Sequence, residues 1–510
     1  MSEPSIRRAG LTLVAFAVIG KVIGFLREAA IAGTYGTSQI VDIYLAAVAV
    51  PALINGILYQ ALPNAFIPLF ARARESSSQT RRVAWGVLVI MVFISAGLWL
   101  FATTIAALTN SGFSASLRAE TVFLVRIMSG SVFLGTIEAL ARSRLLAQKR
   151  FVQTGISSLL LSFAVIAAVV FFPGGGARTL AWGFFAGAAC VALWNVIPFG
   201  KPAASGLATP EGGIQSGSSN PVGGWVAAVI LLNTVNLLYG LIDRHLGSYL
   251  VEGSIAALQY SSIVATQPLA ICATAIGMAI FPYLSDRVTA NDHAGSASLF
   301  DRAMRWALLG AIPSAIVVSL LGNAAVTVLF ERGQFDAGSR TITGSLLAIY
   351  GVWIVPAVMG TVVGKVFYAG LRWRPILLAI SLSLLVKTGL SFWWVRTEGV
   401  IGLVWATTVA VLVSVVILFG KMPRWGTQGL WPGWIRLALT TGALFAVPCL
   451  MGRLLPAAIP SLPWKIAAFA SVVTGTGGGS VLLLVFGPRL GIKEIVTMRT
   501  TLGAILLHRK

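Results

Sequence analysis

Apolar residues occur along this chain in long runs that short polar stretches separate. A helix needs roughly 20 mostly apolar residues to cross the hydrocarbon core of a bilayer. Several runs contain glycine or proline, which membrane helices tolerate because neighbouring helices satisfy the freed backbone groups. The pattern predicts fourteen spans, with the bounds 10–32, 39–68, 83–108, 119–146, 152–173, 178–199, 224–250, 254–284, 303–329, 338–369, 375–395, 399–420, 431–452 and 462–487.

The composition agrees with this pattern. Hydrophobic residues make up 57% of the 510 residues and charged residues only 10%, against about 25% in soluble globular chains. So few charges cannot cover a water-soluble surface of this size. We therefore predict an all-α polytopic membrane protein.

The charge balance is basic, with 37 Lys and Arg against 16 Asp and Glu and a net charge of +21. If the N-terminus is cytoplasmic, 24 of the 37 basic residues, Arg142 among them, fall in the tails, cytoplasmic loops and adjoining span ends, and seven fall on the opposite side. This bias predicts that both termini are cytoplasmic. It explains most of the excess without nucleic acid, and no basic stripe is interleaved with aromatic residues.

Six basic residues remain within or at the ends of spans. A cation at the centre of a bilayer costs about 2.5–3.5 kcal/mol, so such residues usually face a polar cavity or a partner. Snorkelling to the headgroup layer is the alternative, above all near the predicted outer ends. The six are Lys21, Arg27, Arg126, Arg244, Lys365 and Lys387.

A cavity lined by these cations would favour an anion, and phosphate or pyrophosphate suits the two-donor fork of arginine. Acids in or near the spans are few, and they are expected to pair with the cations or to bind a coupling ion: Glu28, Asp42, Glu138 and Asp243. For Asp42, stabilisation of the start of its own helix is the alternative.

No catalytic motif accompanies the cations, which favours a transporter over an enzyme. The three cysteines, each within an apolar run, are expected to be small buried hydrophobes: Cys190, Cys272 and Cys449. The histidines are too scattered for a zinc site: His245, His293 and His508. We expect no cofactor, and the coupling ion stays open.

The polar segment 200–223 reads as a linker between two similar halves. The order Ala65–Leu69 with Arg72 after the second span returns as Ala279–Leu284 with Arg287 after the eighth. Six spans per repeat predict two parallel six-helix lobes around a central cleft, which permits alternating access. The predicted division is 1–199 for the N-lobe, 200–223 for a cytoplasmic linker, 224–420 for the C-lobe and 421–510 for two further helices and a tail.

The stretch Gly20–Glu28, continued by Ala32, Tyr35-Gly36, Asp42-Ile43-Tyr44 and Pro51, resembles the amino-terminal signature of the MurJ (MviN) family in the MOP flippase superfamily. The stretch Leu329–Phe335 is similar to that family's LFxRGxF loop motif. The resemblance runs in order over most of the chain.

The resemblance implies a flippase in the bacterial inner membrane for lipid II, an undecaprenyl pyrophosphate that bears a disaccharide-pentapeptide. The cationic cleft would bind the pyrophosphate and sugar head, and the last two spans would help to form a groove for the prenyl tail. Lys21 stands where the family has a Ser-Arg or Ser-Lys pair, and Arg27 and Asp42 match functional positions. Membrane lipids and envelope-synthesis proteins are the implied partners, and a monomer is expected.

Two departures from the family pattern leave the headgroup open. Asn55 stands where lipid II flippases often have arginine, and Tyr260–Ile263 lacks the arginine of a Tyr-x-x-Arg motif. Either Arg244, Lys365 or Arg126 compensates, or the chain is a paralogue that flips an exopolysaccharide repeat-unit lipid. A MATE-like drug exporter, which would need an acidic cleft, and a membrane scaffold without transport are further alternatives.

Overall fold

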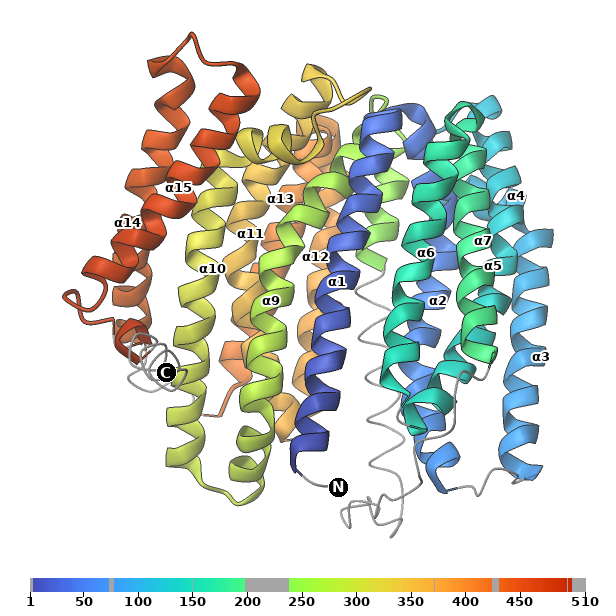
Figure 1. Ribbon diagram of the computed structural model, residues 1–510, viewed down its shortest axis with the longest axis horizontal. Coiled ribbons are helices and arrows are strands. Elements are labelled where there is room, and N and C mark those ends of the chain that lie inside the picture. Colours follow the sequence, from blue (N-terminus) through green and yellow to red (C-terminus); the bar gives the residue numbers. More distant parts are fainter. Residues whose placement is uncertain are drawn as a thin grey trace. The chain divides into compact units, whose positions relative to one another are not determined.

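The computed structural model describes residues 3–72, 78–148, 150–197, 238–370, 372–423, 431–492 and 494–497. Within these ranges it describes only the backbone of residues 3–14, 17, 60, 61, 64, 65, 67–72, 78–80, 272–282 and 289. The described residues form helices and turns and contain no strand (Figure 1). The predicted all-α class is therefore confirmed.

The chain forms two compact units. The first comprises the residues up to Ala256 together with Arg332–Phe335. Within it α5 packs against α2, α3 and α7, and α6 packs against α1 and α7. Its elements are α1 (Glu3–Tyr35), α2 (Gln39–Arg72), α3 (Ser78–Leu100), α4 (Ala102–Thr109), α5 (Ala115–Ala147), α6 (Phe151–Phe171), the short 3-10 helix η1 (Pro173–Gly175) and α7 (Gly176–Val196).

The second unit comprises Ala257–Glu331 and the residues from Asp336 onward. Within it α10 packs against α11, α14 and α15, and α13 packs against α11 and α12. Figure 1 shows α14 and α15 as the red pair beside α10. Its elements are α9 (Ser254–Thr289, of which the first three residues belong to the first unit), α10 (His293–Phe330), α11 (Ala337–Ala369), α12 (Trp373–Glu398), α13 (Val400–Lys421), α14 (Trp431–Ala458) and α15 (Trp464–Phe486).

Eleven helices in the described part of the chain are long and apolar enough to cross a membrane. Each coincides with one of the fourteen predicted spans. Of the other three, 10–32 and 254–284 lie in the helices α1 and α9, and the first half of 224–250, residues 224–237, lies outside the described residues. The prediction of a polytopic helical membrane protein is confirmed, and the count of fourteen stays a prediction.

The predicted span 83–108 is interrupted where α3 gives way to α4. Phe101 leaves the helical region with φ −91° and ψ 14°. The backbone hydrogen bonds nevertheless continue from Phe101 N to Gly97 O at 2.8 Å and from Ile105 N to Phe101 O at 2.9 Å. The two helices therefore follow one another without a loop.

The predicted lobes and the compact units differ in one respect. The predicted C-lobe starts at 224, whereas the described residues 238–256 belong to the first unit. They are held there by contacts such as that of Gly112 N with Ser248 Oγ at 3.1 Å. The linker 200–223 lies outside the described residues, so the division by duplication stays a prediction.

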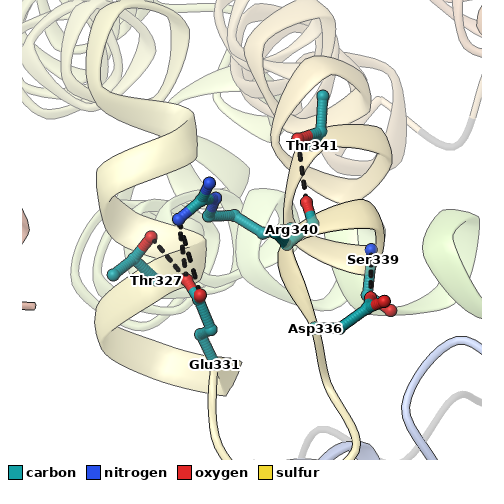
Figure 2. A network of polar contacts seen from close by, with 7 residues as sticks. Thr327, Glu331, Asp336, Ser339, Arg340 and Thr341 are labelled. Atoms are coloured by element: carbon teal, nitrogen blue, oxygen red, sulfur yellow. Dashed lines mark hydrogen bonds and ion pairs between the residues drawn. The ribbon is translucent and has the colours of Figure 1, made fainter. Parts of the chain in front are cut away.

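The LFxRGxF-like segment forms the junction between α10 and α11. Glu331, directly after α10, receives Arg340 Nη1 on both carboxylate oxygens, at 3.4 and 3.3 Å, and Thr327 Oγ1 at 3.1 Å (Figure 2). Asp336 caps α11 by accepting a hydrogen bond from Ser339 N at 2.8 Å. Glu331 within the motif and Asp336 directly after it therefore fix how α10 ends and α11 begins.

Candidate functional site

Two arginines distant in sequence act on one buried tyrosine in the first unit. Tyr44, on α2, is 7% exposed, and both Arg27 on α1 and Arg244 interact electrostatically with its hydroxyl. Asp243, next to Arg244, interacts with that arginine in turn. We call Arg27, Glu28, Tyr44 and Arg244 the Tyr44 cluster.

Arg27 is held by its neighbour in sequence. Its Nη2 lies 2.5 Å and its Nε 3.1 Å from Glu28 Oε1, so the guanidinium edge binds one carboxylate oxygen. The Glu28 side chain is 9% exposed and the Arg27 side chain 26%. A buried carboxylate needs such a partner, and an incoming anion would have to compete with it for the same donors.

Asp42 lies two residues before Tyr44 on α2 and has a different partner from the predicted one. Its Oδ2 accepts a hydrogen bond from Gly253 N and its Oδ1 one from Ala256 N, each at 2.7 Å. The carboxylate is 4% exposed. Asp42 therefore satisfies free N–H groups at the start of α9, besides lying in the first turn of its own helix.

The two remaining cations of the first unit lie apart from these contacts. Lys21 is exposed, and because six residues turn a helix by about 240°, it lies on another face of α1 than Arg27. Arg126 is exposed, and its guanidinium covers the Trp99 ring at 5.2 Å. This stacked arginine agrees with the snorkelling alternative for Arg126.

Asn55 lies between α2 and α5. Its Nδ2 donates to Ser131 Oγ at 3.3 Å, and a Cβ at Gly135 would collide with its Oδ1. The Asn55 amide therefore fits only because residue 135 is glycine.

Glu138, one turn further along α5, is half-buried. Arg142, which the charge count placed with the cytoplasmic side, lies within α5 against the Tyr59 ring at 4.0 Å.

Two predicted cations belong to the second unit. Lys365 is half-buried on α11, with its Nζ 5.8 Å from the centre of the Tyr368 ring. Lys387 on α12 is fully buried, and its Nζ donates to Leu403 O at 3.0 Å and to Thr407 Oγ1 at 2.6 Å on α13. Lys387 thus joins two helices.

The described residues contain no group of three or more His, Cys, Asp or Glu side chains that could hold a metal ion. Cys449 is buried, as expected. The expectation was wrong for Cys190, which is exposed on α7, because none of the described residues covers its side chain. The side chain of Cys272 lies outside the described residues.

Comparison with known proteins decides the family. The family model of the lipid II flippase MurJ matches residues 31–471, most of the chain. The chain belongs to the MurJ family. The predicted family is therefore confirmed, and with it the interpretation as a transporter.

Two curated MurJ relatives match most of the chain. The lipid II flippase MurJ of Burkholderia cenocepacia is 27% identical over 450 residues, which cover 84% of this chain and 86% of the relative. The MurJ homologue of Rhizobium tropici is 25% identical over 494 residues, which cover 91% and 89%.

Solved structures agree on the fold. A lipid II flippase MurJ in an inward closed conformation has a TM-score of 0.74 at 17% identity, covering 94% of this chain and 99% of that one. An inward-facing MATE transporter of the MOP superfamily reaches 0.60 at 12% identity, covering 84% and 99%. At these identities the likeness concerns the fold alone. The match to the MurJ family favours the flippase over the MATE-like exporter.

Sequence reasoning did not select Tyr44 as a candidate site residue, although it stands in the quoted segment Asp42-Ile43-Tyr44. The available signal was a tyrosine hydroxyl two residues from a carboxylate in an otherwise apolar helix. In the structure Arg27, Glu28 and Arg244 all act electrostatically on Tyr44, whereas Arg126 contacts Trp99 and Asn55 contacts Ser131.

Proposed function

We propose that this chain moves lipid II from the cytoplasmic to the outer leaflet of the bacterial inner membrane, with both termini in the cytoplasm. Membership of the MurJ family over residues 31–471 is the observation that carries the proposal. The excess of basic residues in the tails and predicted cytoplasmic loops supports the orientation. A lipid-linked substrate and the surrounding membrane lipids are then the partners, and the protein acts as a monomer.

The Tyr44 cluster is the proposed contact for the pyrophosphate. Arginine binds phosphate oxygens with two donors at once, and Arg27 already presents two donors to a single carboxylate oxygen. The pyrophosphate would displace Glu28 from Arg27 and recruit Arg244. Because the Arg27–Glu28 ion pair can form again, this exchange allows the pyrophosphate both to bind and to be released.

Lipid II is favoured over an exopolysaccharide repeat-unit lipid by the family match. The departure at Asn55, where an arginine was expected, leaves fewer cations on α2. Arg244 beside Tyr44 supplies a cation to the same unit, which supports the compensation that the sequence suggested. The energy source is proposed to be an ion gradient or the membrane potential, and one charge that moves through a potential of 100 mV supplies about 2.3 kcal/mol.

Reconstitution tests the proposal. Vesicles that contain the protein and labelled lipid II are expected to expose the label to an outer-leaflet reagent, whereas protein-free vesicles are not. The Arg27→Ala variant is expected to lose at least tenfold in rate, which corresponds to about 1.4 kcal/mol. Transport of an exopolysaccharide lipid but not of lipid II would favour the paralogue instead.

A further inference from the structure

A polar stripe follows one face of α5 toward α2. Ser131, Gly135, Glu138 and Arg142 recur at spacings of four, three and four, which places them on one side of a helix. Ser131 is fully buried, whereas Glu138 and Arg142 are half-buried. The stripe therefore becomes accessible toward the end of α5 that the charge pattern predicts to be cytoplasmic.

Arg142 is held by an aromatic ring instead of by an acid. Its guanidinium lies 4.0 Å from the centre of the Tyr59 ring on α2. Glu138 is one turn away, a spacing at which glutamate and arginine commonly pair. Among the described residues neither side chain makes an ion pair or a hydrogen bond, and Arg142 Nε is buried without a hydrogen-bond partner.

An apolar core lies next to this stripe. Leu58, Leu62 and Phe66 of α2 pack with Val132, Ala139 and Leu140 of α5 and with Leu98 of α3. A carboxylate and a guanidinium beside such a core are costly unless something satisfies them. They present, one turn apart, an acceptor for N–H or O–H donors and a donor for a carboxylate.

We propose that Glu138, Arg142 and Tyr59 bind the peptide part of the transported lipid. The groups bound are a peptide carboxylate and the N–H groups next to it. The inference rests on the proposed function and names a part of its substrate. Arg142 would bind the carboxylate edge-on while its face stays on the Tyr59 ring, and Glu138 would accept from the neighbouring N–H groups. Arg142 lies five residues, about 8 Å, before the end of α5, a position that a headgroup entering from the cytoplasmic side reaches early.

The test compares two lipids and three variants. Binding of lipid II and of an undecaprenyl-pyrophosphate disaccharide without peptide is measured for the purified full-length protein and for Glu138→Gln, Arg142→Gln and Arg144→Gln. Arg144 is the matched control, since it is exposed and lies about 200° around α5 from Arg142. Binding of the peptide-free lipid reports that each variant is folded.

We expect Glu138→Gln and Arg142→Gln each to weaken lipid II binding about tenfold, while the peptide-free lipid binds as to the unchanged protein. Arg144→Gln is expected to alter neither. Equal weakening of both lipids, or no weakening of either, overturns the inference and leaves the proposed function standing. If the unchanged protein binds neither lipid, the proposed function fails and this inference fails with it.

Discussion

The carboxylate of Asp42 binds the backbone of Gly253, 211 residues further along the chain. The N–H of Gly253 donates to Oδ2 at 2.7 Å, and the N–H of Ala256 donates to Oδ1 at the same distance. One side chain on α2 thus satisfies two backbone donors around the start of α9. Both partners belong to the first unit, together with the Tyr44 cluster.

Removal of this carboxylate is expected to destabilise the protein. Asp42→Ala leaves two buried N–H groups without an acceptor, at a cost on the order of 2 kcal/mol or more. Asp42→Asn keeps one oxygen and is expected to cost about half as much. Thermal unfolding in detergent, followed by tryptophan fluorescence, measures both. An Asp42→Ala variant that melts with the unchanged protein would show that the two hydrogen bonds contribute nothing.

Gly253 is expected to resist substitution for two separable reasons. Its φ is +83°, and a Cβ would collide with the carbonyl oxygen of Thr37. Gly399 has φ +58°, and a Cβ there would meet no atom of the described residues within 4 Å beyond its own neighbours, so Gly399→Ala measures the conformational cost alone, about 1–2 kcal/mol. Gly253→Ala is expected to lower the melting temperature further. Gly389→Ala, in an open part of α12, is expected to be neutral or slightly stabilising.

Hydropathy was sufficient to predict the helices, because burial in lipid imposes length and composition on each span by itself. It was not sufficient for the partners of the polar residues. The contact of Asp42 with Gly253 depends on how distant segments meet, and no local pattern encodes it. The same holds for Arg142, which the loop count treated as a topology signal and which the structure places on Tyr59. Arg126 was weighed against snorkelling, and its contact with Trp99 favours that alternative.

If the pyrophosphate replaces Glu28 at Arg27, a variant without the Glu28 carboxylate should be stabilised more by lipid II than the unchanged protein is. Glu28→Gln removes the carboxylate that compensates Arg27 and is expected to lower stability. Lipid II is then expected to raise the melting temperature of Glu28→Gln by more than that of the unchanged protein, because the pyrophosphate meets a free guanidinium. Glu120→Gln, at an exposed pair with Arg178 of 3.9 Å, is the matched control and is expected to respond like the unchanged protein. Equal ligand-induced shifts in all three proteins would contradict the exchange.

Lys387 is expected to matter for packing and not for transport. Its fully buried ammonium joins α12 to Leu403 and Thr407 of α13. Lys387→Ala leaves a cavity and is expected to cost about 2–5 kcal/mol, whereas Lys387→Met fills the volume and is expected to be nearly neutral. Melting temperature and lipid II transport per folded molecule are measured together. A stable Lys387→Met protein that fails to transport would instead place Lys387 in the transport mechanism.

The cap of α11 predicts a pH dependence confined to acid. Hydrogen bonds from the backbone and side chain of Ser339 lower the pKa of Asp336 below its ordinary 3.8. A lowered folded-state pKa stabilises the fold above the unfolded-state value, and this contribution is lost as the pH falls through the folded-state value. Asp336→Ala is therefore expected to have a lower melting temperature than the unchanged protein, by the same difference from neutral pH down to about pH 5. Below about pH 4 this difference in melting temperature is expected to shrink. Since Asp336 is exposed, the effect is modest. Asp286→Ala, at an exposed aspartate of α9, is the control and is expected to melt at the same temperature as the unchanged protein at every pH. A melting-temperature difference for Asp336→Ala that stays constant into strong acid would contradict the charged cap.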